Sequence, residues 1–151
     1  MIVGKDSNGL YHVVKTAKVT AAVAAAATAV QVAKGHLFKV GEAITVGGAL
    51  KGASDLIAAI DKSNASYDTI TVAGAIGAAA IGDVLILANV KAAANAAKFK
   101  YVPEAITMNK VDVTVANQQS GLLVRGTVNE SVMPYPIDKD LKATLGFIRF
   151  V

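Results

Sequence analysis

The sequence predicts a mainly β protein, with a small pseudo-symmetric β-barrel-like domain followed by a small β-rich α+β domain. Short runs of Val, Ile and Thr alternate with polar residues along most of the chain, and a unit of two such runs recurs. Hydrophobic residues make up 54% of the 151, which is enough for a buried core, but aromatic residues make up only 5%. The core must therefore be built from small and branched side chains.

Composition divides the chain into four segments. We expect an N-terminal arm or strand over residues 1–18, the barrel-like repeat domain over 19–90, a linker over 91–98 and the second domain over 99–151. The alanine-rich linker contains no large side chain, so it is either extended or one short helical bridge.

The N-terminal segment has two parts. Residues 1–9 mix Gly, Asp, Ser and Asn, and they bury too little apolar surface to become ordered alone, which predicts a loose arm. Residues 10–19 are rich in β-prone side chains and contain two lysines. They form either the first strand of the barrel or an extended segment that docks on a partner.

The alanine-rich stretch 21–27 has high helix propensity, yet it lies between β-branched residues and lacks an apolar stripe. From Thr28 onward, alternation predicts a strand. The stretch is also too short to span a bilayer, which needs roughly 20 apolar residues, so we expect no membrane contact.

An internal repeat follows. Residues 29–35 and 40–46 recur, with one residue inserted, as 69–74 and 81–87. Each copy contains a short strand, a loop, an apolar-Gly-acid turn and a second strand. Two units of this size cannot each close a core, and their pairing therefore predicts one pseudo-symmetric barrel.

The turn of each copy has a defined chemistry. Gly41 and Gly82 supply the backbone dihedral that the turn needs, and Glu42 and Asp83 can accept hydrogen bonds from loop amides. These Gly-acid turns resemble those of cradle-loop barrels. Glu42 and Asp83 are thus expected to stabilise two turns rather than to form an acid and base pair.

The C-terminal third begins with a predicted hairpin. Val and polar residues alternate over 111–115, the stretch 117–121 is polar and ends in Gly, and apolar residues alternate again over 122–128. Gly126 interrupts one face of this second strand. We expect 122–128 to be one continuous, half-buried strand.

A short helix and a last strand follow the hairpin. Asp138 can cap a helix over 139–145, Gly146 can end it, and alternation resumes over 147–151. The segment 133–136 contains two prolines, which cannot donate to a ladder. It forms either an exposed apolar ridge for a partner or a rigid loop folded back on its own domain.

The order of these pieces resembles the head decoration proteins of tailed phages, small proteins that sit on an expanded capsid as trimers. The resemblance rests on residues 101–106, 111–115, 123–130 and 141–148, and covers about the last third of the chain. It implies a non-catalytic structural protein at the capsid surface of the virion, a decoration or head-fibre protein assembled in the host cytoplasm. The implied partner is the major capsid protein.

In that family the N-terminal arm attaches to the shell, which implies the same role for this segment. A β-prone segment can add a strand to an exposed sheet edge, and lysines can steer it toward acidic neighbours. The expected capsid contact residues are Leu10, Tyr11, His12, Val13, Lys15 and Lys18. A core of small side chains gains from association, so we also expect a homo-oligomer, with a trimer favoured.

Other function classes have less support in the sequence. A β-barrel module for carbohydrate or a cell-surface ligand remains the alternative, but only four tyrosines are available as sugar-stacking aromatics. The formal charge of +4 comes from scattered lysines without arginine clusters, so nucleic-acid binding is not expected. The first residues lack a basic segment followed by an apolar run, so secretion through a signal peptide is not expected either.

We expect no catalytic residue, cofactor site or metal site. The chain has no cysteine, and His12 and His36 are isolated from the spacings that bind zinc. No serine is flanked by the glycines of a nucleophile elbow, which disfavours a small hydrolase.

Overall fold

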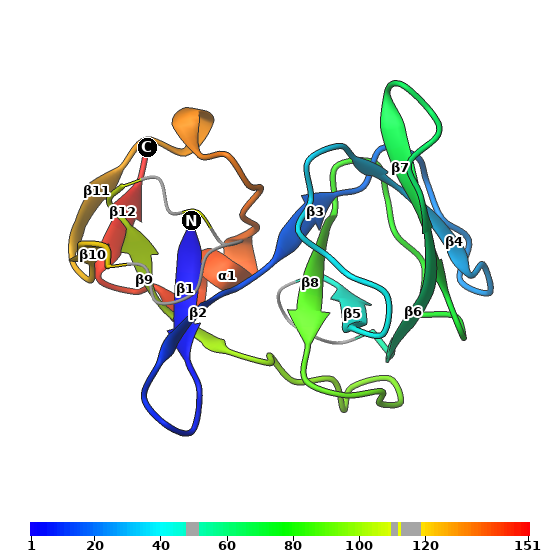
Figure 1. Cartoon of the computed structure of the whole chain (residues 1–151), viewed down its shortest axis with the longest axis horizontal. Helices are drawn as coiled ribbons and strands as arrows, with labels where there is room; N and C mark the ends of the chain where they lie inside the picture. The colour runs from blue at the N-terminus through cyan, green and yellow to red at the C-terminus, as the bar shows by residue number, and fades with distance from the viewer. Residues whose placement is uncertain (48–51, 110–111, 113–118) are drawn as a thin grey trace.

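The computed structural model describes all residues except 48–51, 110–111 and 113–118 (Figure 1). The described residues confirm a mainly β protein, with one α-helix, α1 (Lys139–Thr144), and one 3-10 helix, η1 (Glu130–Val132). No described helix is long and apolar enough to cross a membrane. The strands are β1 (Ile2–Lys5), β2 (Tyr11–Val13), β3 (Thr16–Lys18), β4 (Ala29–Ala33), β5 (Ala43–Val46), β6 (Ser54–Asp61), β7 (Tyr67–Val72), β8 (Val84–Ala88), β9 (Val102–Thr107), β10 (Leu122–Leu123), β11 (Gly126–Val128) and β12 (Ile148–Phe150).

Two units lie side by side (Figure 1). The six-stranded unit contains one sheet in the order β3-β8-β5-β6-β7-β4, and its outermost strands approach each other at an antiparallel bridge between Val19 and Val32. The terminal unit contains α1, a sheet in the order β10-β9-β1-β2 and the parallel pair β11-β12. The six-stranded unit is therefore inserted between β2 and β9 of the terminal unit.

The repeat is confirmed by the pairing of its copies. β4 and β7 occupy matching positions in the two copies and pair antiparallel, with Val30 opposite Ile70. β5 and β8 also match and pair antiparallel, with Thr45 opposite Ile86. Such pairing of equivalent strands gives the unit an approximate two-fold relation. The alanine-rich stretch 21–27 forms no helix, because Val23 is instead held by a bridge to Ala79.

Strand β8 is shared between two hydrophobic cores. Leu85 and Leu87 pack in the core of the six-stranded unit, whereas Val84 and Ile86 pack with residues of the terminal unit. All of β8 is buried, as a continuous apolar run predicts for a strand covered on both faces. The two units are thus joined by a common strand and not only by a linker.

The N-terminal segment is not a loose arm, which corrects the prediction for residues 1–9. Strand β1 lies inside a sheet, with β2 on one side and β9 on the other, and Ile2 and Val3 are buried. Local composition suggested too little apolar surface for order. The missing partner is β9, about a hundred residues further along the chain, and loop-closure entropy permits such distant pairing at modest extra cost.

The predicted strand 122–128 is also corrected, because the chain forms two short strands there. β10 pairs with β9, a bend follows, and β11 pairs in parallel with β12. Gly126 allows this change of partner, since its φ of +150° is rarely adopted by other residues. The expected partner strand, 111–115, lies outside the described residues apart from Asp112.

The helix and last strand are confirmed. The Asp138 carboxylate accepts the Leu141 N–H at 2.8 Å and caps α1, whose C-cap is Leu145. The segment 133–136 folds back on the body: Thr16 Oγ1 donates a 2.8 Å hydrogen bond to Pro136 O, and Met133 packs against the terminal core. That bond also ties β3 to the terminal unit.

Candidate interaction surface

The six predicted contact residues lie along one stretch of backbone but not on one surface. Leu10 precedes β2, the next three residues form β2, and Lys15 and Lys18 lie at and beyond the crossing into the six-stranded unit. β2 is the outermost strand of its sheet, so one side of its backbone pairs with β1 and no described strand pairs with the other. The β1–β2 hairpin projects from the body of the molecule (Figure 1).

The tip of this hairpin is rigid because of Asp6. One carboxylate oxygen accepts the N–H groups of Asn8 at 2.8 Å and Leu10 at 3.0 Å, and the other lies 2.9 Å from His12 Nε2. These contacts, the one to His12 above all, lower the pKa of the Asp6 carboxyl. Gly9, at φ +79°, completes the turn. The tip is therefore organised before any partner binds.

The exposed face of the hairpin combines apolar and cationic groups. Lys5 on β1 stands opposite Tyr11 on β2 and Val102 on β9, so the three side chains form a row across the sheet. Lys5 Nζ lies 5.0 Å from the Tyr11 ring centroid and 3.5 Å from a Glu104 carboxylate oxygen. The pKa of Lys5 is raised, chiefly by its interaction with Tyr11. Val102, at one end of the row, is 57% exposed, and Leu10, which directly precedes Tyr11 in the chain, is 62% exposed. We call Lys5, Leu10, Tyr11 and Val102 the hairpin patch.

The other face of the hairpin packs against the strand that follows the linker. His12 stacks on Tyr101, with ring centroids 4.5 Å apart and planes 12° apart. The backbone of residues 101–102 approaches Gly4 so closely that a Cβ added at Gly4 would lie 2.1 Å from Val102 O. Only glycine fits at position 4, and the His12 ring, although 39% exposed, is fixed between its stack on Tyr101 and its contact with Asp6.

Lys15 and Lys18 lie in different surroundings. Lys15 forms an ion pair with Glu42 of the six-stranded unit, and both side chains are more than four-fifths buried. Lys18 instead lines a cleft of about 250 Å³ between the units, together with Val84, Met133 and Tyr135. Lys18 makes no ion pair with a described residue, so it is the one of the pair that remains available.

Leu10 and Tyr11 are neighbours in sequence and both are exposed at the start of β2, whereas His12 contacts Tyr101 and Asp6, and Lys15 and Lys18 lie toward the six-stranded unit. Val13 is half-buried opposite Val3 in the β1–β2 pair. Sequence reasoning missed Lys5 and Val102. The alternation of Lys5 with Val3 was a usable signal for the first. Nothing local could reveal Val102, because its position depends on pairing between distant segments.

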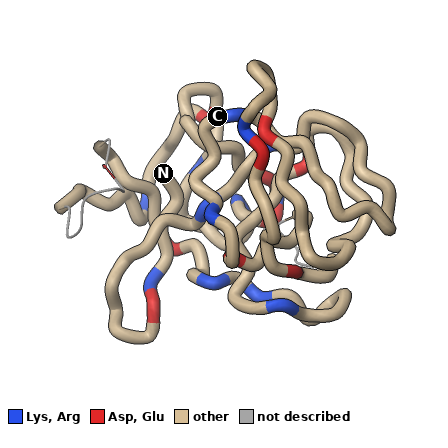
Figure 2. Tube along the Cα trace, turned by 45° about the vertical axis from the view of Figure 1, so that its right-hand side comes forward, with Lys and Arg blue, Asp and Glu red and all other residues tan. Residues whose placement is uncertain are grey.

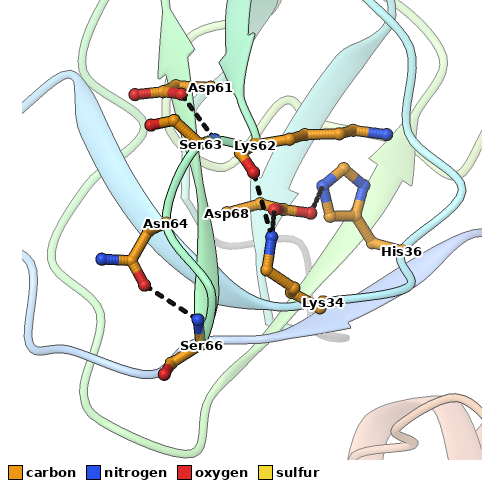
Figure 3. Close-up of polar contacts among 8 residues, drawn as sticks. All are labelled: Lys34, His36, Asp61, Lys62, Ser63, Asn64, Ser66 and Asp68. Carbon is orange, nitrogen blue, oxygen red and sulfur yellow. Dashed lines mark hydrogen bonds and ion pairs between the residues drawn. The ribbon is translucent and has the colours of Figure 1, made fainter.

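A second polar cluster lies in the six-stranded unit (Figure 3). Asp68 accepts a 2.7 Å hydrogen bond from Lys34 Nζ and lies 3.3 Å from His36 Nε2. The Phe38 N–H donates to His36 Nδ1 at 3.2 Å, so a neutral ring has its proton on Nε2. Nε2 is buried 3.3 Å from Asp68 Oδ2 but makes no hydrogen bond with a described residue. Burial lowers the pKa of His36.

The contacts of this cluster hold neighbouring segments of the six-stranded unit together. Lys34 also donates to Lys62 O at 3.2 Å, which ties β4 to the loop between β6 and β7. In that loop Asp61 and Asn64 each accept the N–H two residues on, at Ser63 and Ser66 (Figure 3). Within the described residues no group of three or more His, Asp or Glu could hold a metal ion.

Comparison of the chain with protein-family models, with curated proteins and with solved structures finds no match in any of the three.

Proposed function

We propose that this chain is a structural virion protein that binds the outside of a phage capsid as a decoration or head-fibre protein and catalyses no reaction. The observation that supports this best is the projecting β1–β2 hairpin, with the unpaired outer edge of β2 and the exposed residues of the hairpin patch. The resemblance of the C-terminal third to head decoration proteins supports the same function. The partner would be the major capsid protein.

The hairpin supplies two kinds of contact to such a partner. The free side of β2 offers backbone N–H and C=O groups to an edge strand of the shell, which is binding by strand addition. Leu10, Tyr11 and Val102 offer apolar surface, and Lys5 adds a positive charge. Because Asp6 already fixes the tip, little conformational entropy is lost on binding.

This proposal replaces the flexible arm of the sequence analysis with a preformed hairpin. Deletion of residues 1–9 is no longer a clean test, since it removes β1 from the middle of its sheet. Substitutions in the hairpin patch change the exposed surface and leave the sheet pairing in place.

The test is sedimentation with purified empty capsids. The double variant Leu10→Ser, Tyr11→Ser should bind at least tenfold more weakly, because two central apolar contacts of an interface are together worth more than about 1.4 kcal/mol. A matched control is Val40→Ser, Ile81→Ser, which removes two apolar side chains that are 60% and 69% exposed in the six-stranded unit. Equal binding by wild type and both variants would exclude the hairpin patch as the contact.

The same proposal includes a homo-oligomer, with a trimer favoured. Its support is a core built mainly from Ala, Val, Ile and Leu, together with large apolar side chains that remain exposed. Native mass measurement of the free protein and of the capsid-bound protein tests it. A monomer in both states would refute this part and leave the capsid contact standing.

The alternative, a module that binds carbohydrate through exposed aromatics, has less support. Tyr11 is 39% exposed, whereas Tyr67, Tyr101 and Tyr135 are half-buried. One exposed tyrosine beside a lysine suits a protein interface better than a stacking platform for sugars.

A further inference from the structure

The parallel pair β11–β12 presents an uncovered face. Thr127 stands opposite Arg149, and the ladder continues at both ends, with Gly126 N–H donating to Phe147 O at 3.2 Å and Val151 N–H to Val128 O at 3.0 Å. The inner face packs Ile148 against the terminal core. Parallel strands are normally covered on both faces, so an exposed outer face on such a pair is unusual.

The outer face combines arginine with apolar groups. Arg149 lies on it between Phe147, 78% exposed, and Val151, 60% exposed, two residues away on either side. Arg125, directly before β11, is exposed as well. These are the only two arginines of the chain, and neither side chain makes a hydrogen bond or ion pair with a described residue.

Acidic residues are scattered over both units (Figure 2), and every described side-chain carboxylate except that of Asp140 already has a partner, so a second copy could offer these arginines little without breaking a contact. Asp6 already binds His12 and two backbone amides, and Asp83 accepts the Ala80 N–H. The carboxylates already paired with a lysine are Glu42, Asp55, Asp68, Glu104 and Glu130. Charge complementarity therefore favours a different, acidic molecule.

We infer that the outer face of β11–β12 binds an acidic segment of another protein, with Arg125 and Arg149 each holding a carboxylate and Phe147 supplying the apolar anchor. A guanidinium binds a carboxylate through two parallel hydrogen bonds, and arginine and aromatic residues dominate the energetics of protein interfaces. Nucleic acid is a poorer match, because tracking a phosphate backbone takes more cations than two. This surface lies outside the hairpin patch, and its assignment does not depend on the proposed function.

The two arginines allow a direct measurement. Their Nε–Hε groups give two correlations in a ¹H–¹⁵N spectrum, which Arg125→Lys and Arg149→Lys assign. The probe is an acetylated hexapeptide in which glutamate and leucine alternate. Both correlations should shift on titration, and the same peptide with glutamine in place of glutamate should shift neither.

Affinity for the glutamate peptide should fall about tenfold or more in Arg125→Ala, Arg149→Ala, as expected when charged hydrogen bonds are lost. The matched control is Lys39→Ala, Lys98→Ala, which removes the same charge at exposed lysines without an ion pair to a described residue. Circular dichroism confirms that each variant is folded. An equal loss in the control, binding of the glutamine peptide, or a stronger response to a single-stranded DNA hexamer than to the peptide would each overturn the inference.

Discussion

Glu42 and Asp83 occupy equivalent positions in the two copies of the repeat, and each carboxylate accepts a hydrogen bond from the backbone N–H three residues earlier. Lys39 N lies 2.9 Å from Glu42 Oε2, and Ala80 N lies 2.8 Å from Asp83 Oδ2. The turns also share a backbone bond, since the glycine before each acid donates to a neighbouring strand at 2.8 and 2.9 Å. The two acids thus have one structural role, as predicted.

The first prediction concerns the glycines of these turns. Gly41 and Gly82 have φ values of +86° and +95°, and a Cβ at either would contact nothing within 4 Å. Gly→Ala should therefore cost only the backbone strain of a left-handed residue, about 1–2 kcal/mol of unfolding free energy, and nearly the same at both sites. Denaturant unfolding measures both.

Gly146→Ala is the control, because Gly146 lacks a positive φ and has room for a Cβ. It should change the unfolding free energy by less than about 0.5 kcal/mol. If Gly41→Ala and Gly82→Ala lowered the unfolding free energy by very different amounts, the two turns would not be structurally equivalent.

The second prediction concerns Gly4. A Cβ at this position would lie 2.1 Å from Val102 O, and backbone cannot move aside as a flexible side chain can. Gly4→Ala should lower the unfolding free energy by about 3 kcal/mol and disturb the stack of His12 on Tyr101. Gly9→Ala, at an open turn position with φ +79°, should cost only the strain of a left-handed residue, about 1–2 kcal/mol. Equal costs would show that β1 and β9 separate easily.

The third prediction concerns pH and His36. Burial holds the pKa of His36 in the fold below its ordinary value of 6.5. The unfolded chain takes up a proton near pH 6.5, whereas the fold does not until a lower pH, so the stabilising contribution is full above 6.5 and declines as pH falls toward the folded pKa. Asp68, Lys34 and Lys62 are the charged groups that act on the ring.

Thermal unfolding between pH 7.5 and 5 tests this. The midpoint of wild type should fall as pH decreases, and His36→Gln should show a shallower fall over the same range. A slope that is unchanged in His36→Gln would assign the pH dependence to other groups.

The fourth prediction concerns the tie between the units. Thr16→Val keeps the side-chain shape but removes the hydroxyl that donates to Pro136 O at 2.8 Å. Loss of this hydrogen bond should lower the unfolding free energy by about 1 kcal/mol. It should also speed hydrogen exchange at residues 133–137, because the Pro136 carbonyl loses its partner. Thr127→Val, on an exposed face, should do neither. Unaltered exchange in Thr16→Val would mean that packing of Met133 and Ile137 alone holds the segment.

Local patterns predicted the parts of the fold that local chemistry determines. The Gly-acid turns, the Asp138 cap and the strand after each Gly-acid turn each follow from residues within a few positions of one another. The repeat added long-range information, because similar strands in two copies have a symmetric way to pair. These expectations are confirmed.

The missed features depend on distant pairing. β1 is ordered by β9, and Gly126 turns the chain from one sheet to another, yet neither partner is adjacent in sequence. The hairpin patch was half foreseen for the same reason: Leu10 and Tyr11 lie on the predicted segment, whereas Val102 reaches the patch only through the sheet. The contacts of His12 with Tyr101 and of Lys15 with Glu42 could not be predicted either, because these partners are far along the chain.

The insertion of the six-stranded unit between β2 and β9 sets an order of events during synthesis. Ile2 is synthesised before the six-stranded unit, but Ile106, its partner, emerges only after every strand of that unit has been made. That unit can therefore pair its strands while the β1–β2 hairpin, with its exposed apolar side chains, still lacks its partner strand β9. The β1–β2 hairpin, which contains most of the proposed capsid contact, is thus the part of the chain that a chaperone would have to shield longest.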